Sequence, residues 1–136
     1  RRFIMKLRIS SKGRYKIVTV YDPLKVISDL SELKKIIENF LKDGEKFIAV
    51  NFADASYLYS GAISVLILCY RMIRDRGGHL CILEPHKRIL ELLMQINIDS
   101  LIDIYNKEDE LLNLNVSTES RKKVSREHHS KCIKEA

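Results

Sequence analysis

The sequence predicts an α/β domain with a mostly parallel sheet, opened by an N-terminal antiparallel hairpin, in the order β-β-α-β-α-β-α-β-α. Short runs rich in apolar and β-branched residues alternate with segments whose apolar residues recur every three to four positions. No internal repeat or linker interrupts this alternation. The chain has 136 residues, 46% of them hydrophobic and 31% charged, which suits a single domain with a substantial core.

The hairpin is expected from two runs near the N-terminus. Residues 3–9 alternate loosely between apolar and polar side chains and end in a turn signal over residues 10–13. Residues 15–21 are rich in β-branched and aromatic residues, which favours a second strand. Asp22-Pro23 then ends the ladder, because proline has no N–H to donate.

The first helix is expected to begin near residue 30. Ser28 and Asp29 offer side-chain oxygens for its N-cap, and Asp43-Gly44 ends it. Its apolar residues form one stripe at helical spacing: Leu30, Leu33, Ile36, Ile37, Phe40 and Leu41.

The second half of the chain repeats the alternation. Residues 46–52 are apolar without alternation, which is typical of a strand covered on both faces. A polar stretch over residues 53–59 follows, and then a helix over residues 61–76 that Gly77-Gly78 closes. The remaining expected elements are a strand at 79–83, a helix at 86–96, a strand at 101–105 and a helix near 107–114 with Asn106 as its N-cap.

The net charge is +6, and the basic excess lies at the two ends of the chain. Residues 1–14 hold six Lys and Arg and no acid, whereas residues 117–136 hold six bases and three acids. Such ends attract polyanions, but Trp is absent and no basic stripe carries interleaved aromatics, which argues against nucleic-acid recognition. We expect residues 1–116 to form the domain and residues 117–136 a polar, disordered tail.

Composition also argues against a membrane protein and a secreted one. The longest apolar run, residues 62–70, is about half of the ~18–20 residues that a bilayer span needs. The first residues carry charge but no apolar signal segment. Cys69, Cys81 and Cys132 are an odd count without CxxC spacing, which favours reduced thiols in a cytoplasmic protein.

No catalytic, metal-binding or cofactor-binding pattern is recognisable. The phosphate-binding patterns GxxxxGK[ST] and GxGxxG are missing, and GxSxG fails because residue 58 is leucine. Two groups of histidine and cysteine are close in sequence, but neither has the fourth ligand of a zinc site. These groups are His79, Cys81 and His86, and His128, His129 and Cys132. The sequence therefore predicts neither an enzyme nor a bound cofactor.

The best candidate for a functional site is Tyr57-Leu58-Tyr59-Ser60-Gly61, between a buried strand and an apolar helix. Loops at the carboxyl ends of parallel strands commonly form the functional edge of such sheets. A phosphate on Ser60 would meet the free N–H groups and the positive dipole at the helix start. The alternative is that Ser60 only caps the helix.

An ordered set of segments resembles a STAS domain, and specifically the bacterial anti-sigma factor antagonists. The strand Phe47-Ile-Ala-Val-Asn-Phe leads to Tyr57-Leu-Tyr-Ser-Gly, where that family has Asp-Ser-Ser-Gly or Asp-Ser-Thr-Gly. The next helix ends in Arg74-Asp-Arg-Gly-Gly, as in the family's Arg-x-x-Gly-Gly, and residues 92–105 match a further family segment. The resemblance covers roughly residues 5–114.

The resemblance implies a non-enzymatic switch in transcription regulation. An antagonist binds an anti-sigma factor, typically a GHKL-type serine kinase, which phosphorylates the serine before the glycine, here Ser60. The partner surface it implies comprises Asp22, Pro23, Leu58, Tyr59, Ser60 and Gly61. Leu58 and Tyr59 stand where the motif has its acid and its first serine.

Two further interpretations stay open. The chain could be a structural STAS module of a stressosome-like scaffold, which a large mass in solution would favour. It could also be an accessory subunit of a transport assembly, which co-purification with membrane subunits would favour. A homodimer is compatible with the antagonist interpretation, whereas nucleic-acid binding through the tail is the weakest option.

Overall fold

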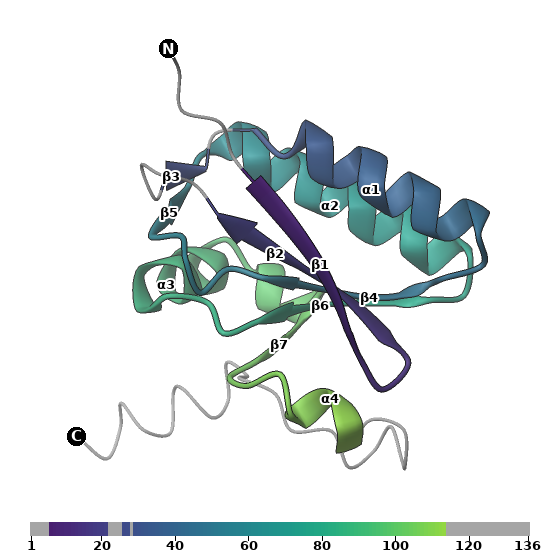
Figure 1. The fold of residues 1–136 in the computed structure, drawn as a ribbon. Coiled ribbons are helices and arrows are strands. Elements are labelled where there is room, and N and C mark those ends of the chain that lie inside the picture. Colours follow the sequence, from purple (N-terminus) through teal and green to yellow (C-terminus); the bar gives the residue numbers. More distant parts are fainter. Residues whose placement is uncertain (1–5, 22–25, 28, 114–136) are drawn as a thin grey trace.

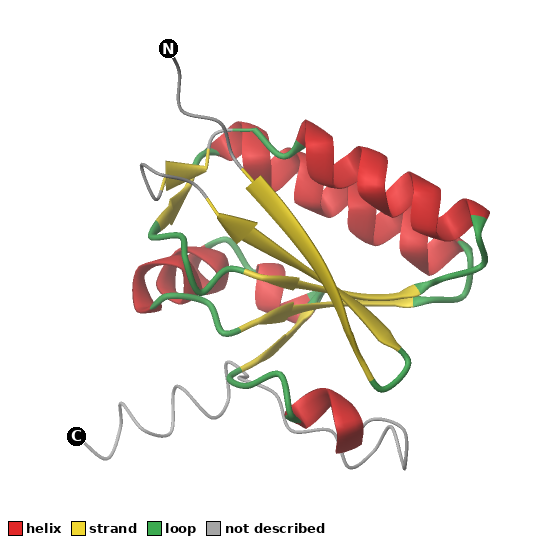
Figure 2. Ribbon diagram, viewed as in Figure 1, coloured by secondary structure: helices red, strands yellow, loops and turns green. Residues whose placement is uncertain are grey.

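A computed structural model describes residues 6–21, 26–27 and 29–113. Its main sheet has five strands (Figures 1 and 2). They are β1 (Lys6–Lys12), β2 (Tyr15–Tyr21), β4 (Phe47–Asn51), β6 (His79–Leu83) and β7 (Asp103–Tyr105). The order across the sheet is β1-β2-β4-β6-β7, with β1 antiparallel to β2 and the other neighbours parallel. The predicted fold class, a mostly parallel sheet opened by a hairpin, is confirmed.

The hairpin turn is tighter than the sequence predicted. β1 continues through the expected turn region and ends at Lys12, which pairs with Tyr15. Gly13, with φ of 60°, is the first of the two turn residues, a position where a type II′ turn needs a positive φ. The polar residues Ser10 and Ser11 indicated a turn, but they fit an exposed edge strand equally well.

Three helices share one core against one face of the sheet. They are α1 (Ser31–Lys42), α2 (Ser60–Asp75) and α3 (Lys87–Gln95). Figure 1 shows α1 and α2 side by side along this face. Alternate residues of each parallel strand enter this core, such as Ile48 and Val50 of β4 and Leu80 and Ile82 of β6.

The opposite face carries a second, smaller core beneath the short helix α4 (Glu110–Asn113). The buried residues of this core are Tyr15, Ile17, Ala49, Cys81, Leu83, Tyr105 and Leu111. β4 is therefore buried on both faces, as its unbroken apolar run predicted.

A chain of hydrogen bonds ties three strands together on this second face. The Tyr15 hydroxyl lies 2.6 Å from Nδ1 of His79, and Nε2 of His79 lies 2.8 Å from the Asp103 carboxylate. Lys12 also forms a 2.7 Å ion pair with Asp109, and its hydrogen bond lowers the pKa of that exposed carboxyl. The hairpin is thereby joined to the segment that leads into α4.

Several expected boundaries were wrong. The stretch 53–59 holds a short strand, β5 (Tyr57–Leu58), which pairs in parallel with β3 (Val26–Ile27) in a separate two-stranded sheet. The strand expected from residue 101 begins at Asp103, because a turn of 3-10 helix, η1 (Ile98–Ser100), precedes it. The final helix begins only at Glu110, so Asn106 is not its N-cap.

The start of α1 also differs in detail. Ser31 is its first helical residue and Leu30 its N-cap. Asp29 still contributes, because its carboxylate accepts hydrogen bonds from the Ser31 hydroxyl at 2.7 Å and the Ser31 N–H at 3.0 Å. These two bonds lower the pKa of Asp29. Ser28 lies outside the described residues, as does the expected tail at 117–136.

None of the helices in the described part of the chain combines the length and the apolar character that crossing a bilayer requires.

Gly78 permits the close packing of the helix-to-strand turn on the start of β4. A Cβ atom at residue 78 would lie 2.1 Å from the Lys46 carbonyl oxygen. The same oxygen accepts the His79 N–H at 2.9 Å, so it cannot move without loss of that bond. We expect Gly78→Ala to lower the free energy of unfolding by about 3 kcal/mol, measured by urea titration.

Gly77→Ala is the matched control. Gly77 has φ of 76°, and a Cβ atom there would lie 3.7 Å from the flexible end of the Lys46 side chain, at ordinary contact distance, so the substitution costs only the backbone strain of about 1–2 kcal/mol. Equal losses at the two glycines would contradict the steric role of Gly78.

The core position of Cys69 gives a further prediction. Burial raises the pKa of the Cys69 thiol to about 12, so the reactive thiolate is scarce at pH 8. In a Cys132→Ser variant, Cys69 and the equally buried Cys81 should stay unmodified by a thiol reagent until the protein is unfolded. Stoichiometric modification of the folded variant, read by intact mass, would contradict the described packing.

Candidate functional site

The predicted site lies where β5 leads into α2. β5 pairs with β3, and the Tyr59 N–H extends this pairing by donating to the Ile27 carbonyl at 2.9 Å. Leu58 and Ile27 are both buried in the main core, so the short sheet is attached to the body of the domain. The backbone directly before Ser60 is thus held in place where the helix begins.

Ser60 is the first residue of α2 and is exposed. The N-cap is Tyr59, whose carbonyl accepts the N–H groups of Ala62 at 3.0 Å and Ile63 at 3.1 Å. The alternative that Ser60 caps the helix is therefore wrong. The N–H groups of Ser60 and Gly61 have no acceptor within the helix and lie at its positive end.

Tyr57 and Tyr59 form an exposed aromatic pair beside Ser60. Their ring centroids lie 5.1 Å apart in an edge-to-face arrangement, and the side chains are 40% and 52% exposed. The partner surface that the family resemblance implies includes Tyr59 but not Tyr57. The short strand was not predictable from the sequence; once residues 57 and 58 are known to form β5, the alternation of side chains places both tyrosines on one face.

The other residues of the implied partner surface differ in their placement. Gly61 is exposed beside Ser60. Leu58 is only 1% exposed and packs in the main core, so its side chain cannot contact a partner directly. Asp22 and Pro23 lie outside the described residues.

Asn51, at the end of β4, organises the start of the loop that leads to the site. It is 3% exposed, and its side-chain oxygen Oδ1 accepts a hydrogen bond from the Ala53 N–H at 2.8 Å. Its amide nitrogen donates to Glu108 at 2.9 Å and to Glu84 at 3.2 Å. This amide therefore joins the ends of two strands to the segment before α4, which the apolar pattern of the sequence did not reveal.

A depression of about 360 Å³ opens beside Asn51 at the carboxyl ends of the strands. Its charged lining is acidic, with Asp54, Glu84 and Glu108. Within residues 6–21, 26–27 and 29–113, no three His, Cys, Asp or Glu side chains are arranged to hold a metal ion.

The histidines of the first cluster have other partners. His79 contacts Tyr15 and Asp103, as described above, and His86 accepts the Arg88 N–H at 3.1 Å as the N-cap of α3. The cluster at residues 128–132 lies outside the described residues.

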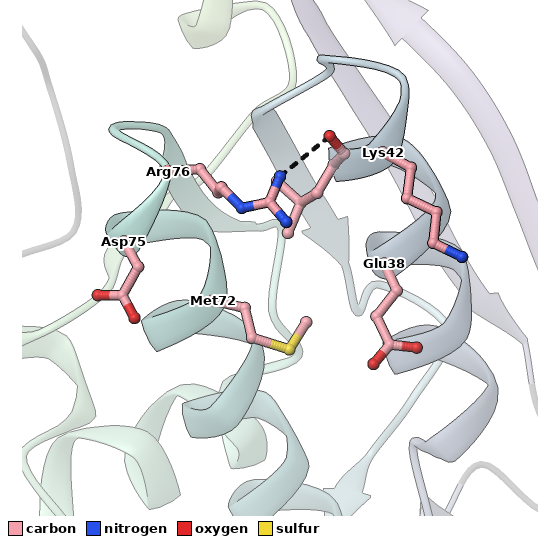
Figure 3. Close-up of a pocket in the computed structure, with 6 residues that line it drawn as sticks. Glu38, Lys42, Met72, Asp75 and Arg76 are labelled. Atoms are coloured by element: carbon pink, nitrogen blue, oxygen red, sulfur yellow. Dashed lines mark hydrogen bonds between the residues drawn. The ribbon is translucent and has the colours of Figure 1, made fainter.

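A second depression, of about 460 Å³, lies between the C-terminal ends of α1 and α2 (Figure 3). Its lining mixes both charges with apolar surface: Glu38, Leu41, Lys42, Met72, Asp75 and Arg76. Arg76 reaches across and donates to the Leu41 carbonyl at 3.3 Å, which ties the two helix ends together. This contact shows that the residues around the depression pack the two helices together. The depression does not include Ser60.

The comparison with protein families identifies a STAS domain. The STAS domain model matches residues 10–111, which is most of the chain, and the chain belongs to this family. A comparison with curated protein sequences gave no match.

Solved structures share this fold at low sequence identity. An anti-sigma factor antagonist from Mycobacterium paratuberculosis is 14% identical, with a TM-score of 0.68 over 82% of this chain and 93% of that chain. The Thermotoga maritima protein TM1081 is 18% identical, with a TM-score of 0.66 over 79% of this chain and 92% of that one. The phosphorylated form of the Bacillus cell fate determinant SpoIIAA is 12% identical, with a TM-score of 0.61 over 79% and 97%.

The contribution of the buried Asn51 amide to the stability of the fold can be tested by substitution. Asn51→Ala leaves the Ala53 N–H and two carboxylates without their partner, and we expect a loss of about 2 kcal/mol in the free energy of unfolding. Asn51→Asp should cost more at pH 7, because it places a third carboxylate beside Glu84 and Glu108.

Asn106→Ala is the control for this test. Asn106 is exposed, so its substitution should change the free energy of unfolding by no more than about 0.5 kcal/mol. An Asn51→Ala variant as stable as this control would show that the amide is dispensable.

Proposed function

We propose that this STAS domain is an anti-sigma factor antagonist that regulates transcription by binding an anti-sigma factor in the cytoplasm. The observation that carries the proposal is the exposure of Ser60 at the first turn of α2, beside exposed Tyr59 and Gly61. Two of the solved structures with this fold are described as anti-sigma factor antagonists from Mycobacterium paratuberculosis and Planctomyces limnophilus. The domain acts by contact rather than by catalysis.

Phosphorylation of Ser60 is the proposed switch. A GHKL-type serine kinase partner transfers the γ-phosphoryl group of ATP to the Ser60 hydroxyl oxygen, and ADP and a proton leave. The product carries about −1.5 to −2 charge at neutral pH. In the free domain, the positive end of α2 stabilises this charge. SpoIIAA has been solved in a phosphorylated and an unphosphorylated form, which supports such a switch in a protein of this fold.

The same charge opposes docking. A contact centred on Ser60 would bury the phosphate between two protein surfaces, away from water. Burial of a charge that no cation neutralises costs desolvation free energy, which weakens the complex. Unphosphorylated Ser60 and the flanking tyrosines present a small, neutral surface instead. Tyrosine suits such a contact because a rigid apolar ring carries one polar group.

The first test uses candidate GHKL-type anti-sigma kinases from the same genome. With the cognate kinase and ATP, intact mass should show the gain of one phosphoryl group, which Ser60→Ala abolishes while complex formation persists. Ser64, also on α2 and exposed, gives the matched control, because Ser64→Ala should leave the gain unchanged. Phosphorylation of the Ser60→Ala variant would contradict this assignment and would show that another residue is the phosphorylation site.

A charge at Ser60 should weaken the complex by itself. Ser60→Asp places a carboxylate at the proposed contact, and calorimetry should show at least about tenfold weaker binding of the anti-sigma factor. Unchanged affinity would contradict a contact centred on this residue. If no candidate binds at all and the protein forms a large homo-oligomer, the scaffold interpretation replaces the antagonist one.

The aromatic pair should contribute to the same contact. Tyr59→Ala removes a half-exposed ring, so we expect about tenfold weaker binding of the anti-sigma factor with an unchanged urea midpoint. Leu68→Ala is the control, because Leu68 lies exposed further along α2 and outside the proposed contact. Equal effects of the two substitutions would remove Tyr59 from the interface.

A further inference from the structure

β1 forms an open edge of the sheet. Among the described residues it pairs with β2 alone, over seven residues from Lys6 to Lys12 (Figure 1). In a hairpin closed by a two-residue turn, the pair next to the turn is hydrogen-bonded, and bonded and non-bonded pairs then alternate. Leu7, Ile9 and Ser11 therefore direct their backbone N–H and C=O groups away from β2. An extended chain laid along this edge could pair with all three residues.

The two faces of this edge differ in chemistry. The side chains of Leu7 and Ile9 lie on the face that carries α1 and α2, where Leu7 packs against the main core and Ile9 stays 51% exposed. Lys6 and Arg8 are exposed on the opposite face, and Arg8 lies 5.3 Å from the Tyr21 ring. Neither of these two cations forms an ion pair with an acid of the described residues.

Charge decides which chain fits this edge. Residues 6–21 hold five bases and no acid. A second copy of β1 would bring like charges together, and residues 117–136 of this chain are themselves net basic. An acidic chain is attracted instead. The exposed apolar side chain of Ile9 and the outward-facing backbone groups, which have no strand partner among the described residues, favour a polypeptide over a nucleic acid.

We propose that the β1 edge binds an extended acidic segment of a partner protein by antiparallel strand addition. The segment alternates apolar residues, which pack beside Leu7 and Ile9, with acidic residues, which face Lys6 and Arg8. The residues that form this surface do not include Ser60, and the proposal does not depend on the function proposed for that residue.

The probe is a fluorescein-labelled heptapeptide, Glu-Val-Glu-Val-Glu-Val-Glu with blocked ends, titrated against the full chain by fluorescence anisotropy. We expect saturable binding that weakens as salt is added. In an antiparallel pair the valine N–H groups face β1, so N-methylation of the valines should abolish binding and N-methylation of the glutamates should preserve it. Equal binding of the two methylated peptides, or no binding of the unmodified probe, would overturn the proposal.

Variants of the protein test the same edge. Ile9→Pro removes an outward-facing N–H and leaves the ladder to β2 intact, so it should weaken binding at least about tenfold in a protein that still folds. The double reversal Lys6→Glu with Arg8→Glu should have a similar effect. The matched reversal Lys35→Glu with Arg71→Glu, at exposed positions of α1 and α2, should change binding less than about twofold.

A labelled single-stranded oligonucleotide of twelve nucleotides separates peptide binding from general attraction of anions. Weaker binding of the oligonucleotide than of the acidic peptide, at the same salt concentration, supports the proposal. Tighter oligonucleotide binding, lost in the Lys6→Glu and Arg8→Glu variant but kept in Ile9→Pro, would identify a polyanion surface and overturn it.

Discussion

The buried amide of Asn51 joins three segments of the chain at the carboxyl ends of the strands, where the loop toward the candidate site begins. It satisfies the Ala53 N–H and two glutamates from different segments, at the point where the central strand leaves the sheet. Without this amide, two carboxylates would face each other at the carboxyl ends of the strands. One neutral side chain thereby holds the start of the loop that continues to β5 and then to α2, whose first residue is Ser60.

The site therefore combines a fixed backbone with small, exposed side chains. The main core holds Leu58 and Ile27, and a backbone hydrogen bond from Tyr59 to Ile27 fixes the residue before the helix. Ser60 and Gly61 then stand at the exposed, positive end of a 16-residue helix. Under the proposed function, a phosphate on Ser60 would meet this positive helix end and would act mainly on what the surface can contact.

Periodicity predicted the long elements because their apolar side chains enter one core. The helical stripe ending at Leu41 and the apolar run over residues 46–52 both reflect burial. β3 and β5 were missed because two residues cannot display a period. Asn51 was missed because its role depends on Glu84 and Glu108, which are distant in sequence. The expected start of α2, residue 61, was one residue too late, because the side-chain type of a residue does not by itself determine where a helix begins.

The side chains along β5 and the residue after it alternate between the core and the surface. Leu58 is constrained by the core, whereas Tyr57 and Tyr59 on either side of it are 40% and 52% exposed. Substitutions at these two positions can therefore accumulate without loss of the folded state. Under the proposed function, a change of these two side chains would alter which partner the domain binds while its architecture stays the same.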